Sequence, residues 1–268
     1  MPDFVPGLQL SEAFYQEAVK PLLDEAFPDL PYAAALLGSG SEVLGYDTPM
    51  STDHHWGPRL LLFLADADYE RRRSDIHDVM SRELPYTFHG YSTHFTLPNP
   101  DDNGVQLLQA ITSGPVNHRV EMLTLRQFFK NALDFDLDSA IEAADWLTFP
   151  QQRLLGITRG AVFHDTVGLE AARARFGWYP RDVWLYLLAS GWARIGQEEP
   201  FVGRTGDVGD EAGSQVITAR LCRDAMRLAF LMERQYAPYA KWFGTALARL
   251  ANAPRLLPSL TSAMAAKT

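Results

Sequence analysis

Gly38-Ser-Gly-Ser-Glu-Val-Leu-Gly45, followed after a short loop by Thr52-Asp-His-His-Trp56, is the stretch that decides the fold of this chain. The apolar run of residues 33–37 comes directly before it and predicts a strand that ends in a tight bend and enters a helical turn. Such a turn leaves backbone N–H groups unpaired at the positive end of a dipole, which suits a phosphate. Gly40 lets the backbone approach that anion closely, and Ser41 offers it a hydroxyl group.

Asp53 and His55 are two residues apart at the expected start of the next strand. Alternation along a strand points these two side chains to one face, while His54 points away. A carboxylate at a strand end beside a phosphate site is a natural Mg²⁺ ligand. The pair therefore predicts a divalent metal ion next to the bend.

The first half of the chain alternates strands and helices. Further strands are expected at residues 59–64, 87–97 and 118–125, and helices at residues 11–27 and 66–84. Ser11 is the expected N-cap of the first helix, and Pro21 is expected to kink or divide it. This alternation predicts an α/β (α+β) domain with a mixed sheet.

Helical patterns dominate after about residue 126. They are expected at residues 125–133, 139–146, 150–164, 168–176, 180–199, 210–236 and 238–250. The tail after residue 254 is weakly patterned and is expected to fray. Asp134, Asp136 and Asp138 form a polar connection near the start of this region. We therefore predict two domains, an α/β domain of residues 1–132 and an all-helical bundle of residues 133–268.

The bend at Gly40-Ser41, the later glycine Gly45 and Asp53 resemble the signature of the DNA polymerase β-like nucleotidyltransferase superfamily. That signature is a hydrophobic run, Gly-Ser or Gly-Gly, a helical turn, a loop, and two acidic residues entering a strand. The chain is also similar to the DUF4037 family, through segments 38–45, 53–59, 195–204, 209–214 and 236–242. The resemblance implies a nucleotidyltransferase-like α/β domain followed by a helical domain.

The chain departs from the superfamily at one position, because His55 stands where the second acidic residue is expected. Paired carboxylates in that site hold two Mg²⁺ ions, which align the attacking hydroxyl and neutralise the triphosphate. Imidazole is a poorer ligand for Mg²⁺ than carboxylate. The resemblance therefore leaves three interpretations open: Mn²⁺ or Zn²⁺ in place of Mg²⁺, a site with one metal ion, or nucleotide binding without catalysis.

The superfamily site also uses a third acidic residue, as a metal ligand or as the base for the acceptor hydroxyl. Glu121, flanked by apolar residues in the expected strand 118–125, is the first candidate. The alternative is a glutamate on an edge strand that faces water. With Glu121, the expected metal ligands are Asp53, His55 and Glu121.

In two-domain nucleotidyltransferases that act on small molecules, a helical bundle closes the cleft, and the resemblance implies the same role here. Segment 198–214 is rich in glycine and carboxylates and is expected to form a lid over the site. The alternative is a flexible, solvated connection. Glu211, within this segment, is a candidate base for the acceptor hydroxyl.

Basic residues of the bundle are candidate phosphate ligands. Arg220, Arg223 and Arg227 are three and four residues apart and share one helix face. Such a stripe is typical of a solvated surface, but facing a nucleotide it can also bind phosphates in a bidentate way. Lys241 is a similar candidate. Arg220, Arg223 and Lys241 therefore join the two bend residues as expected nucleotide ligands.

The composition excludes several classes of protein. The net charge of −9, from 33 acidic and 24 basic side chains, gives no global basic field for nucleic acid. The single cysteine, Cys222, excludes an intramolecular disulfide and a Cys-cluster zinc site. No signal-peptide pattern opens the chain, and no apolar run approaches the ~20 residues of a membrane span. We expect a cytoplasmic protein without a membrane partner.

Together these features predict an enzyme that uses Mg²⁺ or Mn²⁺ and transfers a nucleoside monophosphate from ATP or another NTP. The acceptor is a hydroxyl of a small molecule or a protein, activated by Glu121 or Glu211. The alternative, favoured by His55, is a catalytically impaired nucleotide sensor or regulatory module. A hydrolase that uses Asp53, His54 and His55 ranks lower, because adjacent histidines on a strand diverge.

Overall fold

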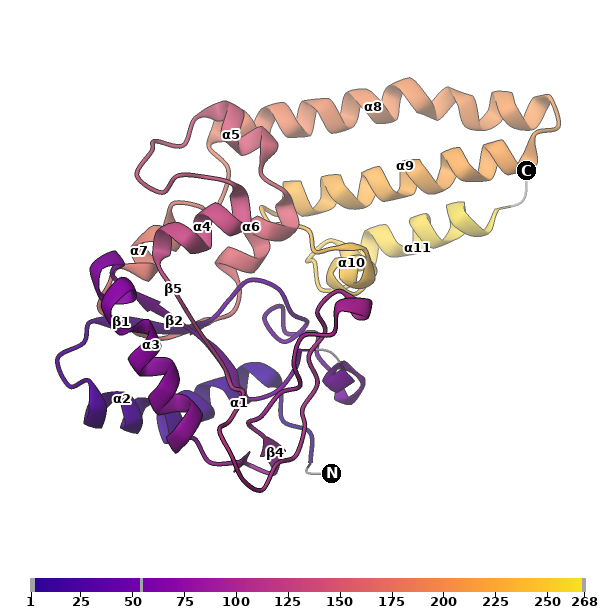
Figure 1. The fold of residues 1–268 in the computed structure, drawn as a ribbon. Helices are drawn as coiled ribbons and strands as arrows, with labels where there is room; N and C mark the ends of the chain where they lie inside the picture. The colour runs from indigo at the N-terminus through magenta and orange to yellow at the C-terminus, as the bar shows by residue number, and fades with distance from the viewer. Residues whose placement is uncertain (1–2, 54, 267–268) are drawn as a thin grey trace. The chain divides into compact units, whose positions relative to one another are not determined.

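The computed structural model describes residues 3–53 and 55–266, and for Asp53 it describes the backbone alone. The chain forms two compact units. Unit 1 comprises Met1–Ala140 and Arg153–Gly177, and unit 2 comprises Ile141–Gln152 and Trp178–Thr268. Unit 1 contains a mixed sheet with helices, whereas unit 2 is built from helices (Figure 1). The predicted fold class, an α/β region with a mixed sheet followed by a helical region, is confirmed.

The sheet of unit 1 has the strand order β5-β2-β1-β6. Its strands are β1 (Tyr32–Leu36), β2 (Arg59–Leu64), β5 (Arg119–Leu123) and β6 (Ala161–Asp165). β1 is antiparallel to both of its neighbours, whereas β2 and β5 are parallel. Every residue of β1 and β2 is buried, as expected for strands that are covered on both faces.

Three helices cover one face of this sheet (Figure 1). They are α1 (Gly7–Phe14), α2 (Lys20–Ala26) and α3 (Asp66–Glu83). Side chains alternate along a strand, so Leu60, Leu62 and Leu64 of β2 all point to this face and join its hydrophobic core. The helices contribute Leu10, Phe14, Leu23, Ile76 and Met80 to the same core.

The N-terminal helical region differs from its prediction at Ser11. Helix α1 begins at Gly7, so Ser11 lies inside it and is not its N-cap. The Ser11 side chain is buried, and its hydroxyl donates a hydrogen bond to the Arg59 carbonyl at 2.5 Å. The division expected near Pro21 is confirmed, because a π-helical turn, Tyr15–Val19, separates α1 from α2 just before this proline. Proline lacks the N–H that a continuous helix needs.

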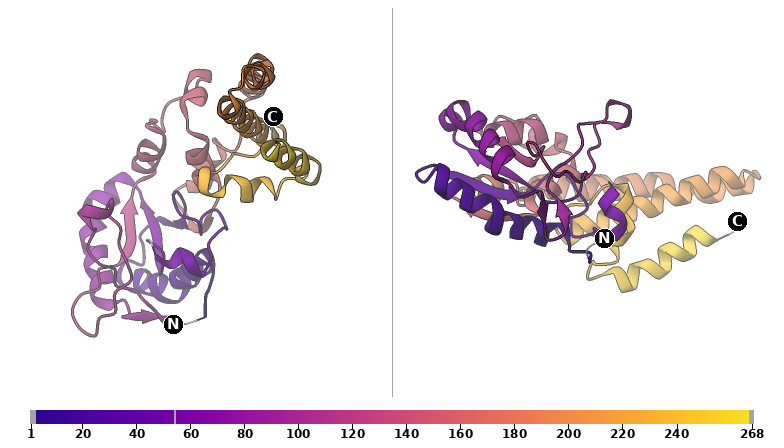
Figure 2. Two further views of the ribbon diagram at one scale, coloured as in Figure 1. Left: turned by 90° about the vertical axis from the view of Figure 1, so that its right-hand side faces the viewer. Right: turned by 60° about the horizontal axis from the view of Figure 1, so that its bottom comes forward.

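The opposite face is covered by α4 (Leu125–Leu133), α6 (Gln151–Thr158) and α7 (Leu169–Ala174), as the two views in Figure 2 also show. Helix α4 has the predicted bounds, and Thr124 with Gln127 forms a capping box at its start. Phe128 of α4 meets Phe63 of β2 edge to face, with ring centroids 5.4 Å apart.

The strand predicted at residues 87–97 is instead a short hairpin of β3 (Thr87–Phe88) and β4 (Tyr91–Ser92). His89 and Gly90 connect the two strands, and both have positive φ angles, of 47° and 85°. Two consecutive residues of this kind form the turn that matches the twist of a tight hairpin. The turn therefore reverses the chain where the sequence pattern suggested that a strand continues.

The helix predicted at residues 150–164 ends at Thr158, and β6 follows it. Gly160 lies between them with a φ of 74°, a left-handed conformation that ends helices. β6 then pairs with β1 at one side of the sheet. The boundary predicted between residues 132 and 133 differs from the division into units for this reason, because residues 153–177 return to unit 1.

Helix α6 holds the segment after β1 through backbone contacts between glycines. The Gly38 N–H donates to the Gly156 carbonyl at 2.9 Å, and the Gly160 N–H donates to the Val43 carbonyl at 3.0 Å. A Cβ atom on Gly156 would lie 2.4 Å from the Gly38 carbonyl oxygen. The two chain segments can approach this closely only because residue 156 has no side chain.

Unit 2 consists of α5 (Ala143–Thr148), α8 (Arg181–Asp207), α9 (Glu211–Met232), α10 (Ala240–Leu247) and α11 (Ala253–Ala265). Helices α8 and α9 run side by side, with α11 next to α9 (Figures 1 and 2). Among the helices of the described residues, none combines the length and apolarity needed to span a bilayer.

Two predictions for unit 2 are wrong. Segment 198–214 is not a lid-like loop, since α8 continues to Asp207 and α9 begins at Glu211. Asp210 caps α9 through the Gly213 N–H, and the Ser214 hydroxyl donates to the Val202 carbonyl, which closes the connection tightly. The tail after residue 254 is helical, because Pro254 occupies the first turn of α11, where proline is favoured.

His118, directly before β5, is buried and held in its neutral form. Its Nδ1 accepts the Val120 N–H at 3.1 Å, and its Nε2 lies 3.3 Å from the His77 carbonyl oxygen. The ring centroids of His77 and His118 are 4.7 Å apart. Burial, and secondarily the charge of His77, lower the pKa of His118 to about 4.

Replacing Gly156 by alanine is expected to destabilise unit 1 by about 1–3 kcal/mol, because the added methyl group meets backbone atoms rather than a flexible side chain. Urea unfolding followed by circular dichroism measures this change. The matched control is Gly196→Ala in α8, where nothing lies within 4 Å. Helix propensity predicts that the control gains up to ~1 kcal/mol. Equal stability of the two variants would contradict the close contact.

The lowered pKa of His118 predicts a loss of stability in acid. Between pH 6.5 and about 4, His118 binds a proton in the unfolded chain but stays neutral in the folded chain. Its contribution to the free energy of unfolding is therefore complete above pH 6.5 and is lost as the pH falls. The loss by pH 4 is roughly 3 kcal/mol. It is measured by urea unfolding from pH 4 to 7. His118→Gln is expected to show a shallower pH dependence than the wild type, and parallel curves would show that His118 does not carry the effect.

Candidate functional site

The bend of residues 38–45 and the starts of β2 and β5 lie at the same edge of the sheet. β1 is antiparallel to β2, with Ala35 opposite Leu61, so the end of β1 is next to the start of β2. β2 and β5 are parallel, with Arg59 opposite Arg119, so these two strands begin together. The topology therefore gathers the bend, the loop before β2 and the first residues of β5.

The bend itself is a single hydrogen-bonded turn. The Tyr46 N–H donates to the Ser41 carbonyl at 2.9 Å, and the Gly45 N–H donates to the Glu42 carbonyl at 3.2 Å. No α-helix follows within the described residues of this segment, so the helix dipole expected at the phosphate site is absent. Within the described chain, the N–H groups of Gly40, Ser41 and Glu42 donate no hydrogen bond to another protein group.

Glu42 and Arg59 form a buried ion pair beneath the bend. The Arg59 Nε donates to Glu42 Oε1 at 3.0 Å, and Arg59 Nη2 contacts the same oxygen and the Ser39 carbonyl, the latter at 2.9 Å. Gly40 has a φ of 137°, and a Cβ atom there would lie 2.6 Å from the Glu42 carboxylate. Glycine at position 40 therefore makes room for the carboxylate.

Asp47 fixes the far end of the bend. Its Oδ2 accepts hydrogen bonds from the Gly7 N–H at 2.6 Å and from the indole N–H of Trp56 at 3.2 Å. Trp56 is fully buried, and a Cβ atom on Gly7 would lie 2.6 Å from its indole nitrogen. The start of α1, the loop after the bend and the segment before β2 are thus joined at one carboxylate.

Asp53 and His55 are not on a strand, contrary to the prediction. Asp53 ends a 3-10 helix, Pro49–Asp53, and β2 begins only at Arg59. Gly57, with a φ of 145°, and Pro58 intervene, and neither is suited to a central strand. The side chain of Asp53 and all of His54 lie outside the described part of the structure. The proposed role of Asp53 therefore stays a prediction.

His55 and Glu121 both contact Arg119. The Arg119 Nη1 lies 2.7 Å from His55 Nδ1, and the Arg119 Nε donates to Glu121 Oε1 at 3.0 Å. Glu121 is half-exposed, and β5 is an edge strand of the sheet, which is the position that the alternative interpretation of Glu121 expects. The register places Arg59 and Arg119 side by side on one face.

The contact with Arg119 favours one tautomer of His55. A guanidinium group only donates hydrogen bonds, so Nδ1 accepts and the imidazole proton is on Nε2. If Nε2 ligated a metal ion, the imidazole proton would be on Nδ1. Nδ1 would then be a donor that faces the Arg119 guanidinium, which is also a donor. While the contact persists, the position between His55 and Glu121 fits an anion better than a metal ion. Among the described residues, no three His, Cys, Asp or Glu side chains are grouped to hold a metal ion.

The other predicted site residues belong to unit 2. Glu211 is exposed in the first turn of α9, where an acidic side chain stabilises a helix. Arg220 is paired with Glu198, and Arg223 is exposed on the same helix face. The Lys241 ammonium lies 4.9 Å from the centre of the Trp242 ring, in a cation–π contact.

Sequence reasoning missed Glu42, Asp47, Arg59 and Arg119, which organise this edge of the sheet. A weak signal was available for Arg59, because it is a charged residue directly before five apolar ones in a strand that is otherwise buried. Burial of such a charge requires a partner. Nothing in the sequence identifies Glu42 as that partner, since only the sheet register brings the two together.

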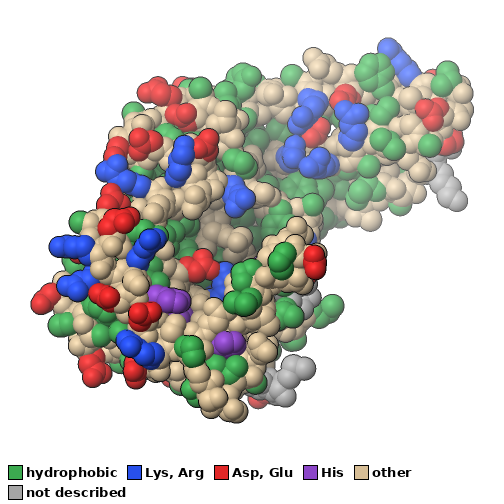
Figure 3. Space-filling model, in the orientation of Figure 1, with side chains coloured by type: hydrophobic (Ala, Val, Ile, Leu, Met, Phe, Trp, Pro, Cys, Tyr) green, Lys and Arg blue, Asp and Glu red, His purple; other side chains and the backbone are tan. Residues whose placement is uncertain are grey.

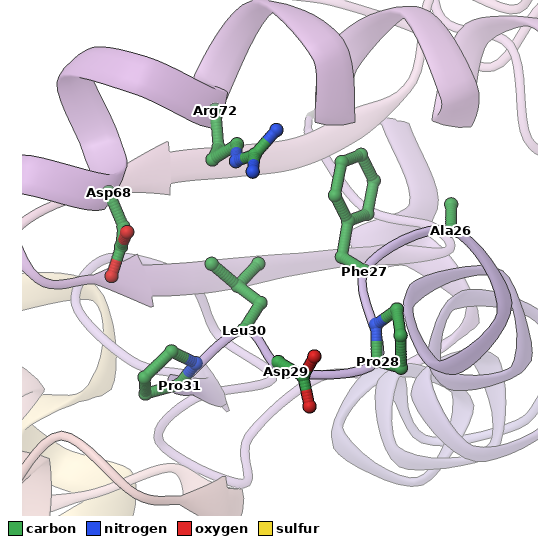
Figure 4. Close-up of a pocket in the computed structure, with 8 residues that line it drawn as sticks. All are labelled: Ala26, Phe27, Pro28, Asp29, Leu30, Pro31, Asp68 and Arg72. Carbon is green, nitrogen blue, oxygen red and sulfur yellow. The ribbon is translucent and has the colours of Figure 1, made fainter.

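A cavity of about 210 Å³ lies at the opposite edge of the sheet. Figure 4 shows Leu30 and Pro31, which directly precede β1, facing Asp68 and Arg72 of α3. The bend follows β1, so the length of this strand separates the cavity from the candidate site. Its lining combines apolar and oppositely charged side chains without a shared contact that would assign it a ligand.

The chain matches the family model of DUF4037, a domain of unknown function, over residues 146–243. No curated protein is significantly similar to the chain. Among solved structures, it is similar to a nucleotidyltransferase-like protein from Exiguobacterium sibiricum 255-15, with a TM-score of 0.32 and 10% identity over 96% of this chain and 76% of that one. So distant a likeness assigns no residue a role. The resemblance to DUF4037 is therefore confirmed for residues 146–243, over which the chain matches the model of this family.

Proposed function

We propose that this chain is a nucleotidyltransferase-like protein that binds a nucleoside triphosphate, with ATP as the first candidate, at the bend of residues 38–45. In this proposal it transfers a nucleoside monophosphate to a hydroxyl of a small-molecule or protein acceptor. The main support is the run of N–H groups at Gly40, Ser41 and Glu42, which have no protein acceptor within the described residues. Successive N–H groups at a tight bend form a concave site for anions.

Arg119 supports the same ligand, because its guanidinium lies at the same edge of the sheet and offers donors that match phosphate oxygens. A triphosphate at the bend competes with Glu121 for these donors. Glu121, once released, is the proposed base for the acceptor hydroxyl.

Asp53 is the proposed ligand of Mg²⁺ or Mn²⁺, since it is the acidic residue closest in sequence to His55. A divalent ion at this point neutralises charge on the triphosphate. His55 and Glu121 complete the proposed ligand set after they leave Arg119. The further proposed nucleotide contact is Ser41 in the bend.

The second candidate function is a nucleotide sensor or regulatory module that binds without turnover. The contact between Arg119 and His55 favours it, because it keeps His55 from ligating a metal ion. A guanidinium in this position still neutralises phosphate charge, so nucleotide binding does not require the second metal ion.

The two candidates are separated by incubating the purified chain with labelled ATP, Mg²⁺ or Mn²⁺, and a panel of hydroxyl acceptors, while pyrophosphate release and ATP binding are measured in parallel. Turnover is expected, and Asp53→Asn and Glu121→Gln are each expected to abolish it without loss of the fold. The matched controls are the exposed residues Asp101 and Glu25, changed to Asn and Gln, which are expected to keep full turnover.

Binding without turnover under both metals identifies the sensor, and a His55→Asp variant that gains turnover would show that His55 is the cause. Turnover retained by Glu121→Gln removes Glu121 from the mechanism. A chain that fails to bind ATP under either metal contradicts both candidate functions.

A further inference from the structure

Helices α8 and α9 of unit 2 carry a group of charged side chains where they run side by side. Gly191 of α8 packs directly against Leu228 of α9, where a Cβ atom would lie 2.7 Å from the leucine side chain. One turn beyond Gly191, Arg194 and then Glu198 face α9. The residues that they meet on α9, Arg220 and Asp224, are four apart and share one helix face.

Two ion pairs connect the helices in this region. The Arg194 Nε lies 2.9 Å from Asp224 Oδ2, and the Arg220 Nη2 lies 2.6 Å from Glu198 Oε1. The carboxylate side chains are only 11% and 21% exposed, whereas Arg194 and Arg220 are 49% and 58% exposed. The acidic groups therefore lie between the helices, and the guanidinium groups reach the surface.

Arg223 and Arg227 of α9 add two further cations on the same face. Both are exposed, and within the described residues neither forms an ion pair with a carboxylate. Partial burial of the Arg227 guanidinium, together with the neighbouring charges of Arg223 and Arg194, lowers the pKa of Arg227, while Asp224 partly offsets this. Four guanidinium groups against two carboxylates leave an excess of positive charge, although the whole chain has a net charge of −9.

Figure 3 shows this concentration of basic side chains over α8 and α9, with acidic side chains among them. The basic residues are all arginines, and no lysine occurs between Lys130 and Lys241. Arginine differs from lysine in its rigid planar donors, which match phosphate oxygens two at a time. Two largely buried carboxylates therefore hold arginine side chains whose donors match an anion with several oxygens.

We propose that the arginine patch, formed by Arg194, Arg220, Arg223 and Arg227, binds an oligophosphate. All four residues belong to unit 2, whereas the bend belongs to unit 1. Arg223 and Arg227 supply the donors that are not used within the protein, while Asp224 and Glu198 hold Arg194 and Arg220 beside them. The ligand is a free oligophosphate or the phosphate chain of a nucleotide, which present the same chemistry.

The test is calorimetric titration of the full chain with inorganic tripolyphosphate at low ionic strength. All variants carry Arg119→Gln, which removes the guanidinium donors next to the bend of unit 1 and leaves the same background in every comparison. Arg223→Gln with Arg227→Gln is expected to weaken binding at least about tenfold, because bidentate charge-assisted hydrogen bonds are lost. The matched control, Arg204→Gln with Arg255→Gln, removes the same charge from exposed sites of unit 2 outside the patch and is expected to change affinity less than about threefold.

Equal affinities of patch and control variants would overturn the proposal. Binding of a single-stranded oligonucleotide without binding of tripolyphosphate would also overturn it, in favour of a nucleic-acid surface. A variant with Arg223→Lys and Arg227→Lys keeps the charge but loses the planar donors. It is expected to bind tripolyphosphate more tightly than the double Gln variant but less tightly than the chain with both arginines. A titration with ATP distinguishes the two phosphate sources, since tighter binding of ATP assigns a nucleotide. Failure of ATP to bind at the bend leaves all these outcomes unchanged.

Discussion

The buried ion pair between Glu42 and Arg59 is the contact on which the edge of the sheet depends. It joins the bend after β1 to the first residue of β2, and Arg59 also holds the Ser39 carbonyl. Loss of one partner leaves an uncompensated buried charge, which costs about 3–5 kcal/mol. Such a pair is not a strong source of stability in itself. Its effect is to specify one conformation of the bend, because any other places a charge without a partner in the core.

Two neighbouring arginines at this place in the sheet have different environments. Arg59 and Arg119 lie opposite each other on parallel strands, but Arg59 is buried and fully engaged with the bend. Arg119 is engaged with His55 and the half-exposed Glu121, whose carboxylate can turn to water. The Glu121 carboxylate can therefore leave Arg119 for water, whereas loss of the Glu42 contact leaves Arg59 as a buried charge without a carboxylate partner. Two adjacent positions of one sheet thus differ: Arg59 is fixed in a buried ion pair, whereas the pair of Arg119 with Glu121 can open to water.

Local sequence signals predicted the parts of the fold that local chemistry determines. β2 has five consecutive apolar residues after Arg59, and α4 has its own capping box, so both have the predicted bounds. β6 was missed because its residues form a strand only by pairing with β1, more than a hundred positions earlier. The hairpin at His89 and Gly90 was missed because histidine is an unusual residue for its left-handed turn position.

In the candidate site, too, the sequence predicted the features that depend on local residues and not those that depend on strand pairing. The glycines and Ser41 of the bend are visible as a cluster, and their place after β1 follows from the preceding apolar run. The partners of His55 and Arg59 were not visible, since they depend on the register that sets β5 beside β2. The start of the strand was also predicted too early, at Asp53 and His55, because Gly57 and Pro58 delay the start of β2 to residue 59.

The return of residues 153–177 to the first unit has a consequence for biosynthesis. A chain that emerges from the ribosome N-terminus first cannot complete this sheet until β6 has left the exit tunnel, by which time the first segment of the other unit has already appeared. The two units are therefore interleaved along the gene. No single cut in the coding sequence separates them, and a fragment that stops before β6 exposes the hydrogen-bonding groups of β1 to other chains.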